Sequence, residues 1–163
     1  MTSRERLLFA IPALSILLML ADEWIKWAIL QANPETFRKI LPFFSLTIHK
    51  NIGLIFDIPF RMPLIILFSL LVGAALIRLA QNHTKERPEI ASAAALIIIG
   101  ALGNIYDRIV YGFTVDYLLF FGRSAINLSD LIILAGIIWL LLAGRRLQPR
   151  ENEDVIDNTE KKA

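Results

Sequence analysis

The chain has 163 residues, of which 56% are hydrophobic and 20% are charged, and its formal net charge is +2. Soluble domains are about 45–50% apolar and about one quarter charged, so this composition excludes an ordinary soluble domain and indicates a membrane protein. The absence of cysteine excludes disulfides, thiolate metal sites, a cysteine nucleophile and a lipid-modified cysteine in the chain itself.

The other reactive side chains narrow the chemistry further. Only His49 and His83 offer imidazole, which is too few for the usual zinc site or for a strong serine protease triad. The basic residues flank apolar runs and form no stripe, so nucleic acid is not expected as a partner. Fifteen acidic residues remain in an otherwise apolar chain, and their positions therefore deserve the closest reading.

Four predominantly apolar stretches are long enough to cross a bilayer as helices. They are residues 7–30, 63–80, 91–110 and 126–143. Arg4 and Arg6 precede the first stretch, as in a secretory signal peptide, but no small-residue cleavage site follows and the apolar segment resumes after Glu23. The sequence therefore predicts an all-α membrane protein with four transmembrane helices, the first of which is retained.

The distribution of Lys and Arg outside these stretches predicts the orientation. Ten lie on the side of the two termini and of the second connection, and five lie in the first and third connections. By the positive-inside rule, both termini are expected in the cytoplasm.

The first outer loop, residues 31–62, is long enough to carry structure of its own. Residues 44–51 alternate between apolar and polar side chains, which predicts a half-buried strand, and Asn51 and Gly53 suit a turn or bulge after it. A small extracytoplasmic β-sheet is therefore expected in this loop. Asn33 and Pro34 give a weaker signal for a short interfacial helix that extends toward Leu41.

Two regions are expected along the chain. Residues 1–149 form one four-helix domain that includes the loop 31–62. Residues 150–163 contain five acids and two lysines with few large aliphatic side chains, which predicts a disordered acidic cytoplasmic tail.

A few acidic residues lie in or beside the spans, where ionisable groups are costly and by default face the bundle interior and serve a function. With a cytoplasmic N-terminus, the first of them lies about 22 Å along its helix, in the outer part of the bilayer. The others fall where the third helix ends, in the outer loop, and where the fourth helix begins. Separate segments thus bring polar groups to one level near the outer surface, namely Asp22, Glu23, Asp107, Asp116 and Asp130.

Spacing separates supporting residues from reactive ones. Asp22 and Lys26 are four residues apart and predict an intrahelical ion pair that neutralises two buried charges. Asn104, Asp107 and Arg108 share one face of the third helix, where Arg108 and Asp107 fit a link between helix ends as well as contact with a substrate.

Asn127 and Asp130 are three residues apart and point the same way. Asp116 and Asp130 have no basic residue three or four positions away, so two carboxylates brought to one low-dielectric place would share a proton. That is the chemistry of an aspartic protease, in which one carboxylate activates water and the other donates a proton. Spacing alone does not separate this chemistry from a proton or cation pathway through the same acids.

Five motifs in order resemble those of the bacterial lipoprotein signal peptidases, also called signal peptidase II. Asp22 and Lys26 match the D-x-x-x-K motif of that family, and residues 51–56 are similar to its N-x-G-x-x-F motif. The runs GALGNIYDR at 100–108, VDY at 115–117 and NLSD at 127–130 follow. The resemblance covers nearly everything from residue 7 to residue 144.

The resemblance implies an intramembrane aspartic endopeptidase of the bacterial cytoplasmic (inner) membrane. Such an enzyme removes signal peptides from prolipoproteins by cutting before a cysteine that carries diacylglycerol. It implies membrane lipids as surroundings, inhibition by globomycin-type cyclic peptides, an active site near the outer face, and no metal or organic cofactor. Carried over to this chain, the catalytic pair falls on Asp116 and Asp130, and the substrate-binding or supporting positions fall on Asn51, Gly53, Asn104, Arg108, Asn127, Asp22, Lys26 and Asp107.

Two departures from the family pattern concern specificity. Ser129 stands where alanine is usual before the second catalytic aspartate, and its hydroxyl group can alter the proton affinity of the pair. Leu54 and Ile55 replace a common pair of alanines, which affects the shape of the pocket. Two other functions stay open: a small proton- or ion-coupled membrane protein that uses the same acids, and a non-catalytic assembly factor in which the polar residues hold helices together.

Overall fold

The computed structural model describes residues 3–31, 39–41, 44–53, 60–121 and 124–145. Its elements are the helices α1 (Ser3–Gln31), α2 (Met62–His83), α3 (Pro88–Val110) and α4 (Leu128–Arg145), and the strands β1 (Lys39–Leu41), β2 (Phe44–Asn51), β3 (Thr114–Phe120) and β4 (Ser124–Ile126). All four helices are long and apolar enough to cross a membrane. The predicted fold class is therefore confirmed. The tail at 150–163 and residues 54 and 55 lie outside the described residues.

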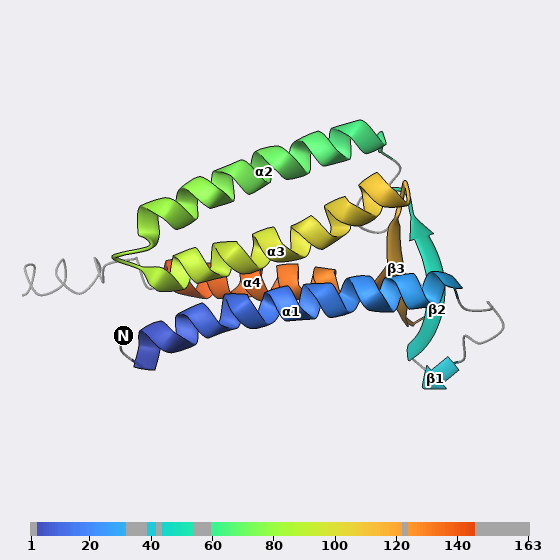
Figure 1. The fold of residues 1–163 in the computed structure, drawn as a ribbon, viewed down its shortest axis with the longest axis horizontal. Coiled ribbons are helices and arrows are strands. Elements are labelled where there is room, and N and C mark those ends of the chain that lie inside the picture. The colour runs from blue at the N-terminus through green and yellow to red at the C-terminus, as the bar shows by residue number, and fades with distance from the viewer. Residues whose placement is uncertain (1–2, 32–38, 42–43, 54–59, 122–123, 146–163) are drawn as a thin grey trace, which may run out of the picture.

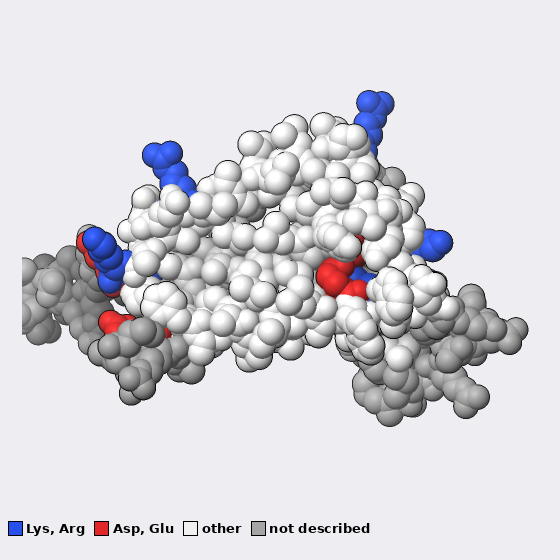
Figure 2. Space-filling view, in the orientation of Figure 1, with Lys and Arg blue, Asp and Glu red and all other residues white. Residues whose placement is uncertain are grey.

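The helices run side by side, and the sheet closes one end of the bundle (Figure 1). The N-terminal end of α1 and the C-terminal end of α4 both lie at the opposite end. On the face in Figure 2, charged side chains gather toward the two ends and leave a broad uncharged band between them. Such a band is what the hydrocarbon core of a bilayer requires, because uncompensated charge is costly there.

The sheet is larger than predicted and combines two connections. The predicted strand at 44–51 is β2, with the same bounds. It pairs antiparallel with β3, which follows α3, and the strand order is β1-β2-β3-β4. The predicted interfacial helix is wrong at residues 39–41, which form strand β1 because they pair with β2; its residues 32–38 lie outside the described residues.

The fourth helix begins two residues later than predicted. Ile126 belongs to β4, where it pairs with Leu118 of β3. The side chain of Asn127 then accepts a hydrogen bond from the backbone N–H of Asp130 at 2.9 Å, which ends the extended segment and starts α4. The apolar run itself does not mark this boundary, because Ile126 is as apolar as the helix that follows.

Close approach of α3 and α4 fixes the orientation of the helix that carries Asp130. A Cβ atom on Gly100 would lie 2.6 Å from the carbonyl oxygen of Ser129, and one on Gly136 would lie 3.0 Å from the carbonyl oxygen of Ala93. Only glycine permits these backbones to approach so closely. α3 is the most buried of the four helices and forms the centre of the bundle.

Candidate active site

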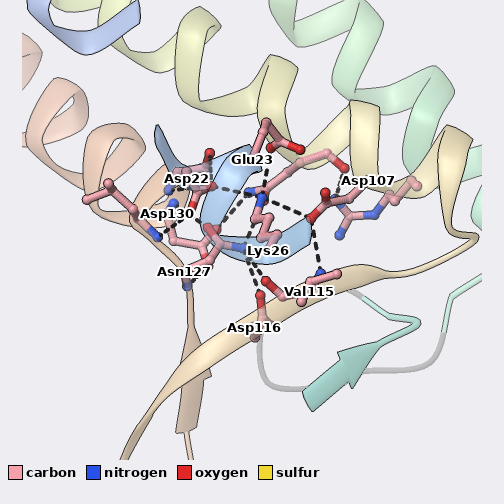
Figure 3. A network of polar contacts seen from close by, with 12 residues as sticks. Asp22, Glu23, Lys26, Asp107, Val115, Asp116, Asn127 and Asp130 are labelled. Atoms are coloured by element: carbon pink, nitrogen blue, oxygen red, sulfur yellow. Dashed lines mark hydrogen bonds and ion pairs between the residues drawn. The ribbon is translucent and has the colours of Figure 1, made fainter. Parts of the chain in front are cut away.

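The polar residues predicted from the sequence gather at the sheet end of the bundle, between α1, α3, β3 and the first turn of α4 (Figure 3). Asp116 has 1% of its surface exposed, and Asp22, Lys26, Asp107 and Asn127 have none. Buried polar groups of this kind are costly unless they are hydrogen-bonded or paired.

Asn127 links the two aspartates that the sequence singled out. Its Nδ2 donates to Oδ1 of Asp116 at 2.8 Å, and its backbone N–H donates to Oδ2 of Asp130 at 3.2 Å. Asn104 on α3 donates from Nδ2 to Oδ1 of Asp130 at 2.7 Å and accepts from Nδ2 of Asn127 at 3.0 Å. The two carboxyl groups are therefore held by one connected set of amides.

The N-terminus of α4 explains the placement of Asp130. Asn127 and Asp130 form a reciprocal capping box, since each side chain accepts a hydrogen bond from the other's backbone N–H. The two backbone N–H groups between them, those of Leu128 and Ser129, donate to the carboxylate of Asp22 on α1, at 3.1 and 3.3 Å. A carboxylate from another helix thus occupies the positive end of the α4 dipole.

Asp22 also reaches the strand that carries Asp116. The hydroxyl groups of Tyr117 and Ser129 donate to it at 2.7 and 2.6 Å. Burial and the nearby carboxylate raise the pKa of the Tyr117 phenol, which therefore stays a donor. Asp22 accordingly connects α1 with the residue next to Asp116 and with the residue next to Asp130.

Lys26 is the centre of a buried ionic cluster. Its Nζ lies 2.8 Å from Asp22 Oδ2, 2.9 Å from Asp107 Oδ2 and 3.1 Å from Glu23 Oε1. The predicted pair with Asp22 is therefore present, within a larger cluster. Asp107 also accepts a hydrogen bond from the backbone N–H of Val115 at 3.0 Å, so this cluster ties the start of β3 to α1 and α3.

The environment of Asp116 favours a proton on its carboxyl group. Burial, followed by the charge of Asp130, raises the pKa of Asp116 from its ordinary value of 3.8 to about 7. A hydrogen bond from Asn51 Nδ2 at 3.0 Å to Oδ2 and one from Asn127 act in the opposite direction, as does His49, which is the cross-strand partner of Asp116.

The end of β2 and the residues after it are connected to α3 through Asn51, Gly53 and Arg108. Oδ1 of Asn51 accepts from the backbone N–H of Gly53 at 2.9 Å, which forms an Asx turn. Arg108 donates to the carbonyl oxygens of Gly53 and Asn104, both at 3.2 Å. Arg108 and Asp107 therefore face different partners, although they are neighbours in sequence.

A cavity of about 370 Å³ contains both aspartates. Its polar end is formed by Asn51, Asn104 and Arg108 with Asp116 and Asp130, and the three residues of β4 run along it. Its apolar part extends between α2 and α4 and is lined by Ile65, Ser69, Ala101, Ile133, Leu134 and Ile137. Within the described segments, no group of three acidic or histidine side chains is arranged to hold a metal ion.

Sequence reasoning did not assign site roles to Tyr117 or β4. The run at 114–120 is rich in Thr, Val, Tyr and Phe, which is a strand signal, and strand alternation would have placed Tyr117 opposite to Asp116. Ser129 was recognised only as a departure from a family pattern. Its contact with Asp22 joins residues 107 positions apart, and no sequence spacing indicates such a contact.

Comparisons with known proteins agree on one family. The profile of a family described as Signal peptidase (SPase) II matches residues 14–145. A lipoprotein signal peptidase of Streptococcus thermophilus is 34% identical, covering 82% of this chain and 90% of the relative. Lipoprotein signal peptidases of Neisseria meningitidis serogroup C and Actinobacillus succinogenes are each 32% identical, covering 79% and 92% of this chain and 85% and 91% of the relatives.

Solved structures show the same fold. Two structures of bacterial membrane enzymes, at 2.3 and 1.9 Å resolution, each align with a TM-score of 0.73 at 21% and 20% identity. They cover 84% and 85% of this chain, and the alignments span 88% and 94% of those chains. At this identity the likeness establishes the arrangement of helices and sheet.

Proposed function

We propose that this chain, which belongs to the signal peptidase II family, is an intramembrane aspartic endopeptidase with Asp116 and Asp130 as its catalytic pair. It removes signal peptides from prolipoproteins and cleaves before the cysteine that carries diacylglycerol. The observation that carries the aspartic mechanism is that both carboxyl groups line one cavity and are linked through Asn127.

The reaction needs one proton on the pair. The ionised carboxylate takes a proton from a water molecule as the water oxygen bonds to the scissile carbonyl carbon. The protonated carboxyl group donates its proton to the carbonyl oxygen, which gives a neutral tetrahedral intermediate. Transfer of a proton to the amide nitrogen then allows the C–N bond to break. The proton belongs to the pair, so base and acid are not assigned to individual residues.

The amide donors around the pair support this chemistry. The side chain of Asn127 donates to one oxygen of Asp116, and the side chain of Asn104 donates to one oxygen of Asp130. These hydrogen bonds restrict the rotation of both carboxyl groups. Preorganised groups of this kind lower the cost of reorientation during the reaction. The raised pKa of Asp116 is consistent with a pair that retains a proton near neutral pH.

The form of the cavity suits a substrate that is partly in the membrane. Its polar end holds the aspartates, and its apolar part continues between α2 and α4, which are two of the candidate membrane spans. A signal peptide is apolar, and two acyl chains hold the modified cysteine at the headgroup level. Globomycin-type cyclic peptides are proposed to occupy the same cavity.

The protein is proposed to lie in the bacterial inner membrane with both termini in the cytoplasm and the sheet on the outer face. The bias of Lys and Arg toward the end with the termini supports this orientation.

The substrate assignment is tested with purified protein in lipid and two peptides of one sequence, with and without diacylglycerol on the cysteine. We expect cleavage before the cysteine, with the lipidated peptide preferred by at least about tenfold in kcat/KM, because the acyl chains hold the peptide at the active site. Equal cleavage of both peptides would contradict the substrate assignment. No cleavage of either peptide would contradict the function.

A further inference from the structure

Strand β4 lies at an edge of the sheet. Its three residues, Ser124, Ala125 and Ile126, pair with β3 on one side. The strand order of the described sheet gives β4 no neighbour on the other side. An edge strand presents N–H and C=O groups that can pair with another extended chain.

The cavity runs along the free edge of β4. Successive side chains of a strand point to opposite faces of the sheet, so a cavity on one face contacts every second residue. Here all three consecutive residues of β4 line the cavity that contains the aspartates. This pattern places the edge of the strand, and therefore its backbone, along the cavity wall.

The register places the catalytic pair just beyond one end of this edge. The β3–β4 pairing ends at Leu118 and Ile126. Asp116 lies two residues further along β3, and Asp130 lies in the first turn of the helix that follows Ile126. A chain that lies along β4 thus has its next peptide bonds at the two carboxyl groups.

We infer that the free edge of β4 binds the substrate as an added β-strand, with the residues on one side of the scissile bond paired to Ser124–Ile126 by backbone hydrogen bonds. The inference rests on the proposed function and specifies how that substrate is held. The occupant is an extended segment of the signal peptide or of the adjoining mature sequence, continuous with the scissile bond.

Two physical reasons favour this mode of binding. A peptide bond must be extended and accessible to be hydrolysed, and an extended backbone near hydrocarbon needs partners for its polar groups. Backbone pairing supplies those partners without demanding particular side chains. A three-residue strand pairs about 10 Å of extended chain, which is enough to fix the register of one peptide bond.

The test is a backbone N-methylation scan of the lipidated peptide, one residue at a time on each side of the scissile bond. Each peptide is measured for binding to the Asp130→Asn variant and for cleavage by the intact chain. Binding isolates this inference, because it is measured without turnover, whereas cleavage of the unmodified peptide tests the proposed function.

We expect binding to weaken by about tenfold at alternate residues on one side of the scissile bond, because every second N–H of an added strand faces β4. The residues between them, and those on the other side, should change by less than about threefold. The protein control Glu86→Gln, which is exposed and lies in the connection between α2 and α3, should bind the unmodified peptide within about twofold.

Losses without alternation, or no loss at any position, would overturn strand addition even if the peptide is cleaved. Equal losses on both sides of the scissile bond would also overturn it, because β4 pairs with one side only.

Discussion

At the scale of single residues, the main feature is that Asp116 and Asp130 have different surroundings. Asp116 lies on β3, and its carboxyl group accepts hydrogen bonds from the side chains of Asn51 and Asn127. Asp130 lies in the first turn of α4, where Asn104 and the backbone N–H of Asn127 donate to its carboxyl group. Because burial and the charge of Asp130 raise the pKa of Asp116 to about 7, the pair retains one proton below neutral pH.

The raised pKa of Asp116 predicts how kcat/KM changes on the alkaline side of its pH profile. We expect kcat/KM to fall as pH rises through about 7, because the pair then loses the proton that the carbonyl oxygen needs. In Asn51→Leu, a hydrogen bond that lowers the pKa of Asp116 is lost, so the midpoint should move to higher pH. An unchanged midpoint in Asn51→Leu would contradict this assignment of the limb.

The raised pKa of Asp116 also makes the free energy of unfolding depend on pH. The folded state holds the Asp116 proton more tightly than the unfolded state does, so this residue's contribution to the free energy of unfolding falls as pH rises from about 3.8 to about 7.

Lys26 gives a second prediction at this scale. Lys26→Met removes the cation shared by three carboxylates and leaves them buried without it, so the free energy of unfolding should fall by about 3–5 kcal/mol. The exposed Lys85→Met is the matched control and should change it by less than about 0.5 kcal/mol. Equal effects of the two variants in denaturant titrations would refute the role of the cluster.

Residue types and short spacings predicted much of this site, including the pair of Asp22 and Lys26. They did not predict that Asp107 turns to Lys26 or that Ser129 and Tyr117 donate to Asp22. These contacts join separate helices and strands, and such distances are determined by packing rather than by the helical period.

At the scale of elements, a hydrogen bond from α3 replaces one that proline removes from the backbone of α1. Pro12 lacks an N–H, so the carbonyl oxygen of Leu8 in α1 loses its ordinary partner. The hydroxyl group of Ser92 on α3 donates to that oxygen at 2.9 Å. The break in α1 is thereby used to attach it to α3.

A double-mutant cycle tests this link. Ser92→Ala should lower the free energy of unfolding by about 1–2 kcal/mol, because a buried carbonyl oxygen is left without a donor. In the Pro12→Ala background, the new N–H of residue 12 supplies the donor, so the same change should cost less than about 0.5 kcal/mol. An identical cost in both backgrounds would exclude the proposed repair.

The helices and β2 were predictable because period and apolar length suffice for them. The start of α4 was missed by two residues, since Ile126 pairs in the sheet and Asn127 caps the helix. Strand β3 was not predicted, although its residues carry a local strand signal. Its pairing with β2 could not be read from the sequence, because α2 and α3 lie between the two strands.

At the scale of the whole molecule, the described acids of the four helices avoid the middle of the spans. Glu5 and Glu89 lie in the first turns of α1 and α3, at the end away from the sheet, and the other described acids lie toward the sheet end. Asp22 and Glu23 lie in the last third of α1, Asp107 is near the end of α3 and Asp130 is near the start of α4. A proton pathway across the membrane would require groups along the depth between the two ends, so this arrangement favours a single site over a relay.

The orientation of the molecule is directly testable because the chain has no cysteine of its own. Ile52→Cys lies at the sheet end and Thr84→Cys lies between α2 and α3, and both positions are exposed. In intact spheroplasts, a membrane-impermeant maleimide should label Ile52→Cys and should label Thr84→Cys only after disruption. The reverse pattern would contradict the proposed orientation.

The most direct measurement is cleavage of the diacylglyceryl-modified peptide by Asp116→Asn and Asp130→Asn, each side by side with the exposed control Glu86→Gln. We expect each aspartate variant to keep its thermal unfolding transition and to lose at least about a thousandfold in kcat, because either change removes one partner of the proton exchange. The control should retain full activity. Cleavage at a near-normal rate by either folded aspartate variant would contradict the catalytic pair.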